Sequence, residues 1–250
     1  MKKPSLLSAV TEPIRASGEF VTSVGLLPFR SRLPIGDPHT VLVLPGFMAT
    51  DRSTVPLRRL LSSLGYDTHG WGLGRNVGPT QRVTRDMPLV LDRLAAAGQP
   101  VSIIGWSLGG IYARQMAART ADQVRVIVTL GTPVRKEVRQ ASNAQGLFDR
   151  LSAFHTPGHP LLDDGDPLDV PVTAVHTRAD GVVHWETCLV RDAPNAENLR
   201  VTGSHTGLGF NPAVAYIIAD RLAQPIGGWA RFEAPAPYQR VISHVGRLSA

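Results

Sequence analysis

Short apolar runs separated by amphipathic segments repeat through most of this chain. The runs rich in Val, Ile and Leu have the length of buried strands, and the segments between them have apolar residues at helical spacing. The predicted strands lie at residues 39–44, 66–73, 101–104, 124–130, 172–176 and 198–202. The predicted helices lie at 55–64, 80–97, 108–118 and 212–222. Strands separated by helices need crossover connections, so we predict an α/β fold with a mostly parallel, doubly wound sheet of about six strands.

The segments around this repeat define the expected domain organisation. Residues 1–38 form an N-terminal leader with one or two short amphipathic helices, whose apolar residues we expect to cover the core. Residues 39–223 form the core, and a cap or lid insertion at 134–170, with a short helix at 147–154, breaks the repeat. Residues 224–250 form a C-terminal tail that we expect to pack on the core with little regular structure.

The turn after the predicted strand at 101–104 has the pattern of a nucleophile elbow. Ser107 stands there with Gly105 and Gly109 two residues away on either side, and a helical pattern follows. A serine on a sharp strand-to-helix turn has a strained backbone, so its neighbours must lack side chains that would clash. The N–H of Leu108, at the start of the helix, would point at a developing oxyanion.

A second oxyanion donor is expected in the loop after the first strand. Pro45, Gly46 and Phe47 follow that strand directly, and Asp51 or Ser53 can cap the next helix. Glycine allows a close approach of the backbone to a substrate, so the N–H of Phe47 is the candidate donor. The alternative is a plain strand-to-helix turn.

Two further side chains complete a catalytic triad with Ser107. Asp180 and His205 each follow the carboxyl end of a predicted parallel strand, the edge at which ligands bind in open α/β sheets. A serine hydroxyl needs an imidazole to accept its proton, and the imidazole needs a carboxylate on its other nitrogen. Alone, Asp180 could be a turn residue and His205 a loop histidine. The rival acids are Asp163, Asp164 and Glu186, and the rival bases are His176 and His184.

Other polar and aromatic residues near these strand ends have less specific interpretations. The candidate substrate-pocket residues are Met48, Trp71, Trp106 and Val182. The glycine-rich stretch at 72–79 lacks the ending of a phosphate-binding loop, and we expect Arg75 and Asn76 to shape the pocket instead. His155, His159 and the nearby aspartates have no metal-ligand spacing, so a polar loop is expected and no metal site.

The composition of the chain limits the kinds of binding partner that we expect. Hydrophobic residues make up 43% of the chain and charged residues 18%, which is typical of a globular protein. The net charge of +6 comes from scattered arginines, so nucleic-acid binding is not expected. Cys188 is the single cysteine, and an inert buried thiol is expected. Because no signal peptide or membrane span is evident, we expect a soluble cytoplasmic protein, with peripheral membrane contact left open.

Five motifs together resemble the α/β-hydrolase superfamily, in particular small bacterial lipases and esterases of the lipase class 2 kind and the GPI-inositol-deacylase-like hydrolases. The motifs are Leu44-Pro-Gly-Phe47, Gly105-Trp-Ser-Leu-Gly109-Gly, Leu130-Gly-Thr-Pro133, Thr177-Arg-Ala-Asp-Gly-Val-Val183 and Gly203-Ser-His-Thr-Gly207. The resemblance spans about residues 39–222 and implies an α/β-hydrolase fold that hydrolyses esters through an acyl-enzyme without a cofactor. Pro45 replaces the histidine with which many lipases begin the oxyanion loop, and no leading antiparallel pair of strands is evident.

Three functions fit this pattern. The first is a serine carboxylesterase or lipase acting on an uncharged small-molecule ester or lipid, with Ser107, His205 and Asp180 as the triad. The second is an acyltransferase or thioesterase of the same fold. The third is a module without catalysis that binds lipid or serves as a scaffold, since function depends on the site and not on the fold. The sequence leaves the acyl chain and the oligomeric state undetermined.

Overall fold

The computed structural model describes residues 2–26, 32–135, 141–159 and 164–245, and they form one sheet with helices around it. The strands are β1 (Thr40–Leu44), β2 (Asp67–Gly70), β3 (Val101–Trp106), β4 (Val124–Leu130), β5 (Val172–His176), β6 (Ala196–Val201) and β7 (Ile242–His244). The helices are α1 (Leu6–Leu26), α2 (Asp51–Ser63), α3 (Gln81–Ala95), α4 (Leu108–Arg119), α5 (Gln145–Arg150) and α6 (Pro212–Ala223). The strand order is β2-β1-β3-β4-β5-β6-β7, and every neighbouring pair is parallel except β6 and β7.

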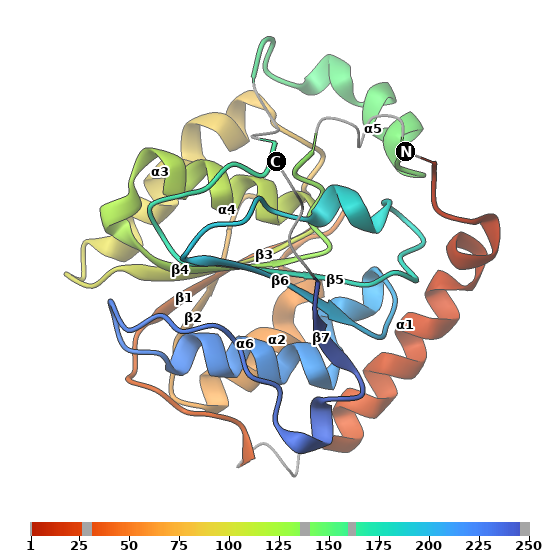
Figure 1. Cartoon of the computed structure of the whole chain (residues 1–250). Coiled ribbons are helices and arrows are strands. Elements are labelled where there is room, and N and C mark those ends of the chain that lie inside the picture. Colours follow the sequence, from red (N-terminus) through yellow and green to blue (C-terminus); the bar gives the residue numbers. More distant parts are fainter. Residues whose placement is uncertain (1, 27–31, 136–140, 160–163, 246–250) are drawn as a thin grey trace.

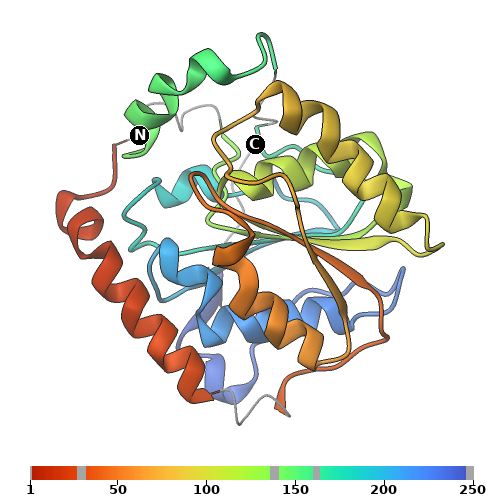
Figure 2. The same cartoon turned by 180° about the vertical axis from the view of Figure 1, so that it is seen from behind.

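The sheet is covered on both faces. Helices α3 and α4 lie on one face and α2 and α6 on the other, as Figures 1 and 2 show from opposite sides. All residues of β3 and β4 are buried, as expected for central strands of a parallel sheet. Helix α1 lies outside these two layers and runs past the edge where the strands end. This architecture confirms the predicted mostly parallel, doubly wound sheet.

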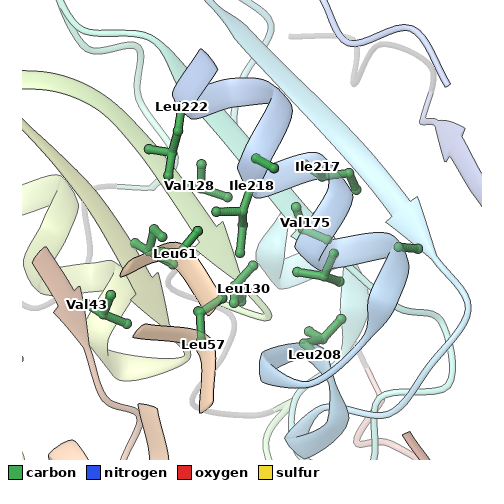
Figure 3. Close-up of a cluster of buried hydrophobic side chains, with 14 of the residues drawn as sticks. Val43, Leu57, Leu61, Val128, Leu130, Val175, Leu208, Ile217, Ile218 and Leu222 are labelled. Atoms are coloured by element: carbon green, nitrogen blue, oxygen red, sulfur yellow. The ribbon is translucent and has the colours of Figure 1, made fainter. Parts of the chain in front are cut away.

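Two apolar clusters hold the layers together. In the cluster of Figure 3, Leu57 and Leu61 of α2 and Ile217 and Ile218 of α6 meet Val128 and its neighbours on the central strands. The other cluster joins α3 and α4 to the opposite face of the same strands. Strands β1, β3, β4, β5 and β6 each contribute side chains to both clusters, which fixes the positions of their carboxyl ends.

The C-terminal tail contains a strand that the sequence did not predict. Strand β7 pairs antiparallel with β6, so the sheet has seven strands where about six were expected. Its three residues are too few to show an alternating pattern. The tail is also fixed by a buried ion pair, because Glu197 accepts hydrogen bonds from Arg221 (2.9 Å) and from the N–H of Phe232 (2.9 Å).

The leader also differs from the prediction. Its first part is one helix of 21 residues, α1, with Pro13 inside it, and not one or two short helices. Most of its apolar side chains do not cover the core, since Leu7, Val10 and Ile14 are each about three-quarters exposed; Ala16 is buried, and Phe20 packs edge to face on Phe210 at 5.4 Å. Residues 27–31 lie outside the described part of the chain. Across the described residues, no helix combines the length and apolar character needed to cross a bilayer.

Other boundaries shift for local reasons. Helix α2 begins at Asp51 with Thr50 as its N-cap, where Asp51 or Ser53 was expected to cap a helix from residue 55. The Asp51 carboxylate instead accepts hydrogen bonds from the N–H groups of Trp71 (2.9 Å) and Gly72 (3.0 Å) after β2. The expected insertion at 134–170 contains α5 and a short 3-10 helix, η4 (Ser152–Phe154); its residues 136–140 and 160–163 lie outside the described residues.

Candidate active site

Ser107 lies on the predicted sharp turn between β3 and α4. Its backbone has φ 52° and ψ −121°, in the region that residues other than glycine rarely adopt. A Cβ on Gly105 would overlap the Cα of Gly110, and a Cβ on Gly109 would overlap the carbonyl oxygen of Leu44. The turn therefore depends on glycine at both predicted positions, and Gly110 is needed as well because it lies against Thr132.

Asp180 and His205, 25 positions apart in the chain, form a direct hydrogen bond of 2.6 Å between Oδ2 and Nδ1. Both side chains are buried. The other carboxylate oxygen, Oδ1, accepts from the N–H groups of Val182 and Val183, each at 2.8 Å. These two donors fix the orientation of the carboxylate, so that one oxygen always faces the imidazole.

The serine turn lies next to this pair. The N–H of Ser107 donates to the carbonyl of Leu130 (2.8 Å), and the next residue, Gly131, lies against the imidazole: a Cβ there would be 3.0 Å from Nδ1 of His205. The indole N–H of Trp106 donates to the His205 carbonyl (3.2 Å). Within the described residues the Ser107 hydroxyl makes no hydrogen bond, so the acid–histidine pair is formed and the serine is its neighbour.

The surroundings of His205 favour a protonated imidazole. Burial acts to lower the pKa of His205, but the charge of Asp180, the hydrogen bond to it and the charge of Glu12 act in the opposite direction. The net result is a pKa of His205 above its usual value. An imidazole of raised basicity is the property that a proton acceptor for a serine hydroxyl requires.

The loop of the expected second oxyanion donor lies beside Ser107. A Cβ on Gly46 would be 3.2 Å from Cβ of Ser107, so glycine permits this approach. The N–H groups of Phe47 and Leu108 donate to no residue in the described ranges, which leaves both free to bind an oxygen of a substrate. Asn76 holds this loop, because its side chain donates to the carbonyl of Pro45 (2.8 Å) and its own carbonyl accepts from the N–H of Met48 (2.7 Å).

The four candidate pocket residues occupy different positions. Trp71 is 1% exposed, its indole N–H donates to the carbonyl of Gly74 (2.9 Å), and its ring stacks on Tyr112. The large apolar ring of Trp71 packs in the core between α3, α4 and the sheet. Trp106 is almost fully buried, and its indole N–H donates to the carbonyl of His205. Met48 is half-buried in the loop after β1 with φ 64°, and Val182 belongs to the Asp180 turn.

The rival acids and bases have other environments. His176 is fully buried in β5 beside Trp185, and burial lowers its pKa to about 4, so it is a neutral core residue. His184 and Glu186 lie 3.9 Å apart on the short helix η5 (Trp185–Cys188) and the residue before it. Asp164 pairs with Arg191 at 3.3 Å, and Asp163 lies outside the described residues.

The predicted polar loop contains one histidine with a structural role. His155 hydrogen-bonds the carbonyl of Val77 (2.8 Å) and fills the space that a side chain on Gly78 would need. Among the described residues no group of three His, Cys, Asp or Glu side chains is arranged to hold a metal ion. Cys188 is buried as expected, and burial raises the pKa of its thiol. A cavity of about 250 Å³ between α3 and α4 is lined by Leu91, Tyr112 and Met116 among others, and by none of the triad residues.

Helix α1 binds the two loops that carry the acid and the histidine. The Glu12 carboxylate accepts from the N–H of Gly181, next to Asp180 (3.0 Å), and from the N–H of Thr206, next to His205 (2.6 Å). Glu19 accepts from the N–H of Ser204 (2.8 Å). This role of α1 was not predicted from the sequence. The signal was the spacing of Glu12, Arg15 and Glu19, which places the three charges on one side of a helix.

A parallel sheet with helices on both faces, a serine elbow after its third strand and an acid–histidine pair at the ends of β5 and β6 together define the α/β-hydrolase fold. Solved structures of low sequence identity share it. One is a structure from work on LipS and LipT, two metagenome-derived lipolytic enzymes. Its sequence is 16% identical to this chain, the match covers 76% of this chain and 93% of that chain, and the TM-score is 0.54.

Two further structures extend this comparison. The alpha/beta hydrolase domain-containing protein 10 from mouse has 16% identity, covering 74% of this chain and 88% of that chain, at a TM-score of 0.54. The monoacylglycerol lipase from Paleococcus ferrophilus has 13% identity, covering 75% of this chain and 97% of that chain, at a TM-score of 0.53. No protein-family model matches the chain, and no curated protein matches it.

Proposed function

We propose that this protein is a serine ester hydrolase, a carboxylesterase or lipase acting on uncharged acyl esters. The observation that supports this most directly is the 2.6 Å hydrogen bond between Asp180 and His205 beside the strained Ser107 turn. A buried carboxylate on Nδ1 leaves Nε2 of the imidazole as the nitrogen that accepts a proton. The fold is shared with lipolytic enzymes of known structure, which favours the same chemistry.

In the proposed acylation, Oγ of Ser107 forms a bond to the carbonyl carbon of the ester while its proton moves to Nε2 of His205. The carbonyl oxygen takes the electron pair and is bound by the N–H groups of Phe47 and Leu108. The bond to the alkoxy group then breaks. The leaving oxygen takes the proton from His205, and the alcohol departs.

Deacylation repeats these steps with water. His205 accepts a proton from the water molecule as its oxygen bonds to the acyl carbon. The bond from that carbon to Oγ of Ser107 breaks, and the serine regains the proton from His205. Asp180 stays ionised throughout and stabilises the imidazolium in both halves of the reaction.

The side chains around the turn favour an apolar substrate. Phe47 and Phe148 of α5 have ring centroids 5.4 Å apart, and Phe210 meets Trp106 edge to face at 5.7 Å. Phe47 follows Gly46, whose backbone lies against Ser107, and Phe210 packs on Trp106 next to Ser107, so aromatic rings near the turn offer apolar surface. An acyl chain fits such surroundings better than a charged group.

The test combines labelling with turnover. We expect a fluorophosphonate probe to label the folded wild-type protein at Ser107, and p-nitrophenyl esters of increasing chain length to be hydrolysed. The Ser107→Ala variant should neither be labelled nor hydrolyse these esters. Equal turnover by the two proteins, or a folded wild type that the probe does not label, would refute the proposal.

The charge of Glu12 provides a second prediction. Because the negative charge of Glu12 acts to raise the pKa of His205, the Glu12→Gln variant should have a lower pKa at His205. The imidazole must be neutral to accept a proton, so activity is lost as the pH falls through this pKa. We therefore expect the acid limb of the kcat/KM profile to move to lower pH in Glu12→Gln.

Glu19→Gln is the matched control. Glu19 lies one to two helical turns away on the same side of α1 and binds the N–H of Ser204, but its charge does not contribute to the shift at His205. Its acid limb should stay at the wild-type position. The prediction fails if both variants move the limb equally, or if neither does.

A further inference from the structure

Helix α1 has its charged side turned toward the protein and its apolar side turned toward solvent. Glu12, Arg15 and Glu19 all hydrogen-bond loops of the core, as Arg15 does with the carbonyl of Ala179 (2.7 Å). The most exposed apolar side chains of α1 are Leu6 (81%), Leu7 (75%), Val10 (74%), Ile14 (75%) and Val21 (69%). A surface helix of a globular protein normally has the opposite arrangement, so this face is built for contact with something else. We call these five residues the outward face of α1.

Between residues 2 and 22, the charged side chains that do not bind the core are of one sign. Between residues 2 and 22 the only acidic residues are Glu12 and Glu19, and both bind the core. Lys2 and Lys3 precede the helix and are exposed. The net charge of the whole chain is +6. The outward face therefore has lysines at one end and no negative charge along it, which suits an anionic surface.

The size of the outward face favours a lipid surface over a second copy of the chain as its partner. From Leu6 to Val21 the helix is about 24 Å long and about 10 Å wide, a footprint of about 240 Å². A stable protein–protein interface buries about 800 Å² of accessible surface on each partner, so a second copy would need surface beyond this one side of a single helix. A helix lying in the headgroup region of a bilayer needs only one apolar face with basic residues beside it.

We infer that the outward face of α1 docks the protein on anionic phospholipid surfaces, with Leu6, Leu7, Val10, Ile14 and Val21 in the headgroup–acyl boundary and Lys2 and Lys3 on the lipid phosphates. Binding of this kind does not depend on ester hydrolysis. It would place the proposed site near lipid, because the other side of α1 holds the loops of Asp180 and His205. Figures 1 and 2 show α5 beside the start of α1, and the same end of the molecule has exposed Leu147 and Phe154.

The experiment is flotation of the full chain with vesicles of phosphatidylcholine containing 30% phosphatidylserine, in the concentration range of roughly 0.01–1 mM lipid. We expect wild type to float with these vesicles and Val10→Ser/Ile14→Ser to bind at least about tenfold more weakly. Lys2→Gln/Lys3→Gln should weaken binding about tenfold on the anionic vesicles and have little effect on pure phosphatidylcholine.

The controls separate this proposal from its alternatives. Leu89→Ser/Ile226→Ser removes exposed apolar side chains of similar size from α3 and from the chain after α6, and should bind like wild type. Ser107→Ala should also bind like wild type, so that a failure of the proposed hydrolysis does not affect the result. Far-UV circular dichroism and the melting temperature confirm folding of every variant.

Three results would overturn the inference. One is a wild-type protein that floats with neither kind of vesicle. Another is equal flotation of Val10→Ser/Ile14→Ser and the control pair. The third is a dimer in sedimentation velocity that Val10→Ser/Ile14→Ser dissociates while vesicle binding is absent, which would assign the outward face to a second copy of the chain.

Discussion

Replacement of Asp180 by asparagine is expected to lower kcat/KM for ester substrates about 10⁴-fold while the fold is kept. The reason lies in the two N–H groups, of Val182 and Val183, that donate to Oδ1. In the variant the amide oxygen must face these donors, so the amide NH₂ faces Nδ1 of His205. The imidazole then keeps its proton on Nε2, the nitrogen that must accept the proton of Ser107.

Glu186→Gln is the matched control for this variant. Glu186 is a rival acid close to His184, and removal of its charge should change kcat/KM less than about threefold. Steady-state kinetics with a p-nitrophenyl ester, together with melting curves, checks both variants. A folded Asp180→Asn protein with more than a tenth of the wild-type rate would show that Asp180 is not the acid of the triad.

The second large effect is expected for Gly105→Ala in β3. The added Cβ would overlap the backbone of Gly110 and lie against that of Gly109, and a helix backbone cannot turn away as a flexible side chain can. The first turn of α4 must therefore move away from the sheet. We expect the free energy of unfolding to fall by about 3 kcal/mol or more, measured by urea denaturation, with loss of activity in the protein that still folds.

Gly146→Ala provides the comparison for this substitution. A Cβ on Gly146 in α5 would have no heavy atom within 4 Å, so the same chemical change should alter stability by less than about 0.5 kcal/mol. If Gly105→Ala were as stable as Gly146→Ala, the close approach of β3 and α4 would not be what requires glycine before Ser107.

The mostly parallel strands and the candidate triad followed from local patterns. The buried strands have continuous apolar runs, and Ser107, Asp180 and His205 each follow one of them, so a parallel sheet brings their ends to one edge. The contacts that hold the loop after β1 have no such pattern. Asn76 was expected to shape the pocket, but its hydrogen bonds to Pro45 and Met48 are visible only in three dimensions.

The orientation of α1 shows why an amphipathic pattern can mislead. The spacing predicts two faces, but it does not say which one meets the protein. Here the loops after β5 and β6 offer unpaired N–H groups, at Gly181, Ser204 and Thr206, and carboxylates satisfy them where leucines cannot. The hydrogen-bond requirements of these loops therefore determine the orientation of α1, although its hydrophobic pattern alone would favour the opposite one.

The buried contact between Glu197, Arg221 and Phe232 has a consequence for where the chain can be cut. The predicted core boundary at residue 223 would leave the Glu197 carboxylate without its N–H donor from Phe232 and would uncover the side chains that the Phe232 ring covers. Limited proteolysis should spare the stretch up to β7, and a truncated expression clone ending at 223 would lack part of its own autonomous folding unit. We therefore expect the minimal domain of this protein to extend to at least His244.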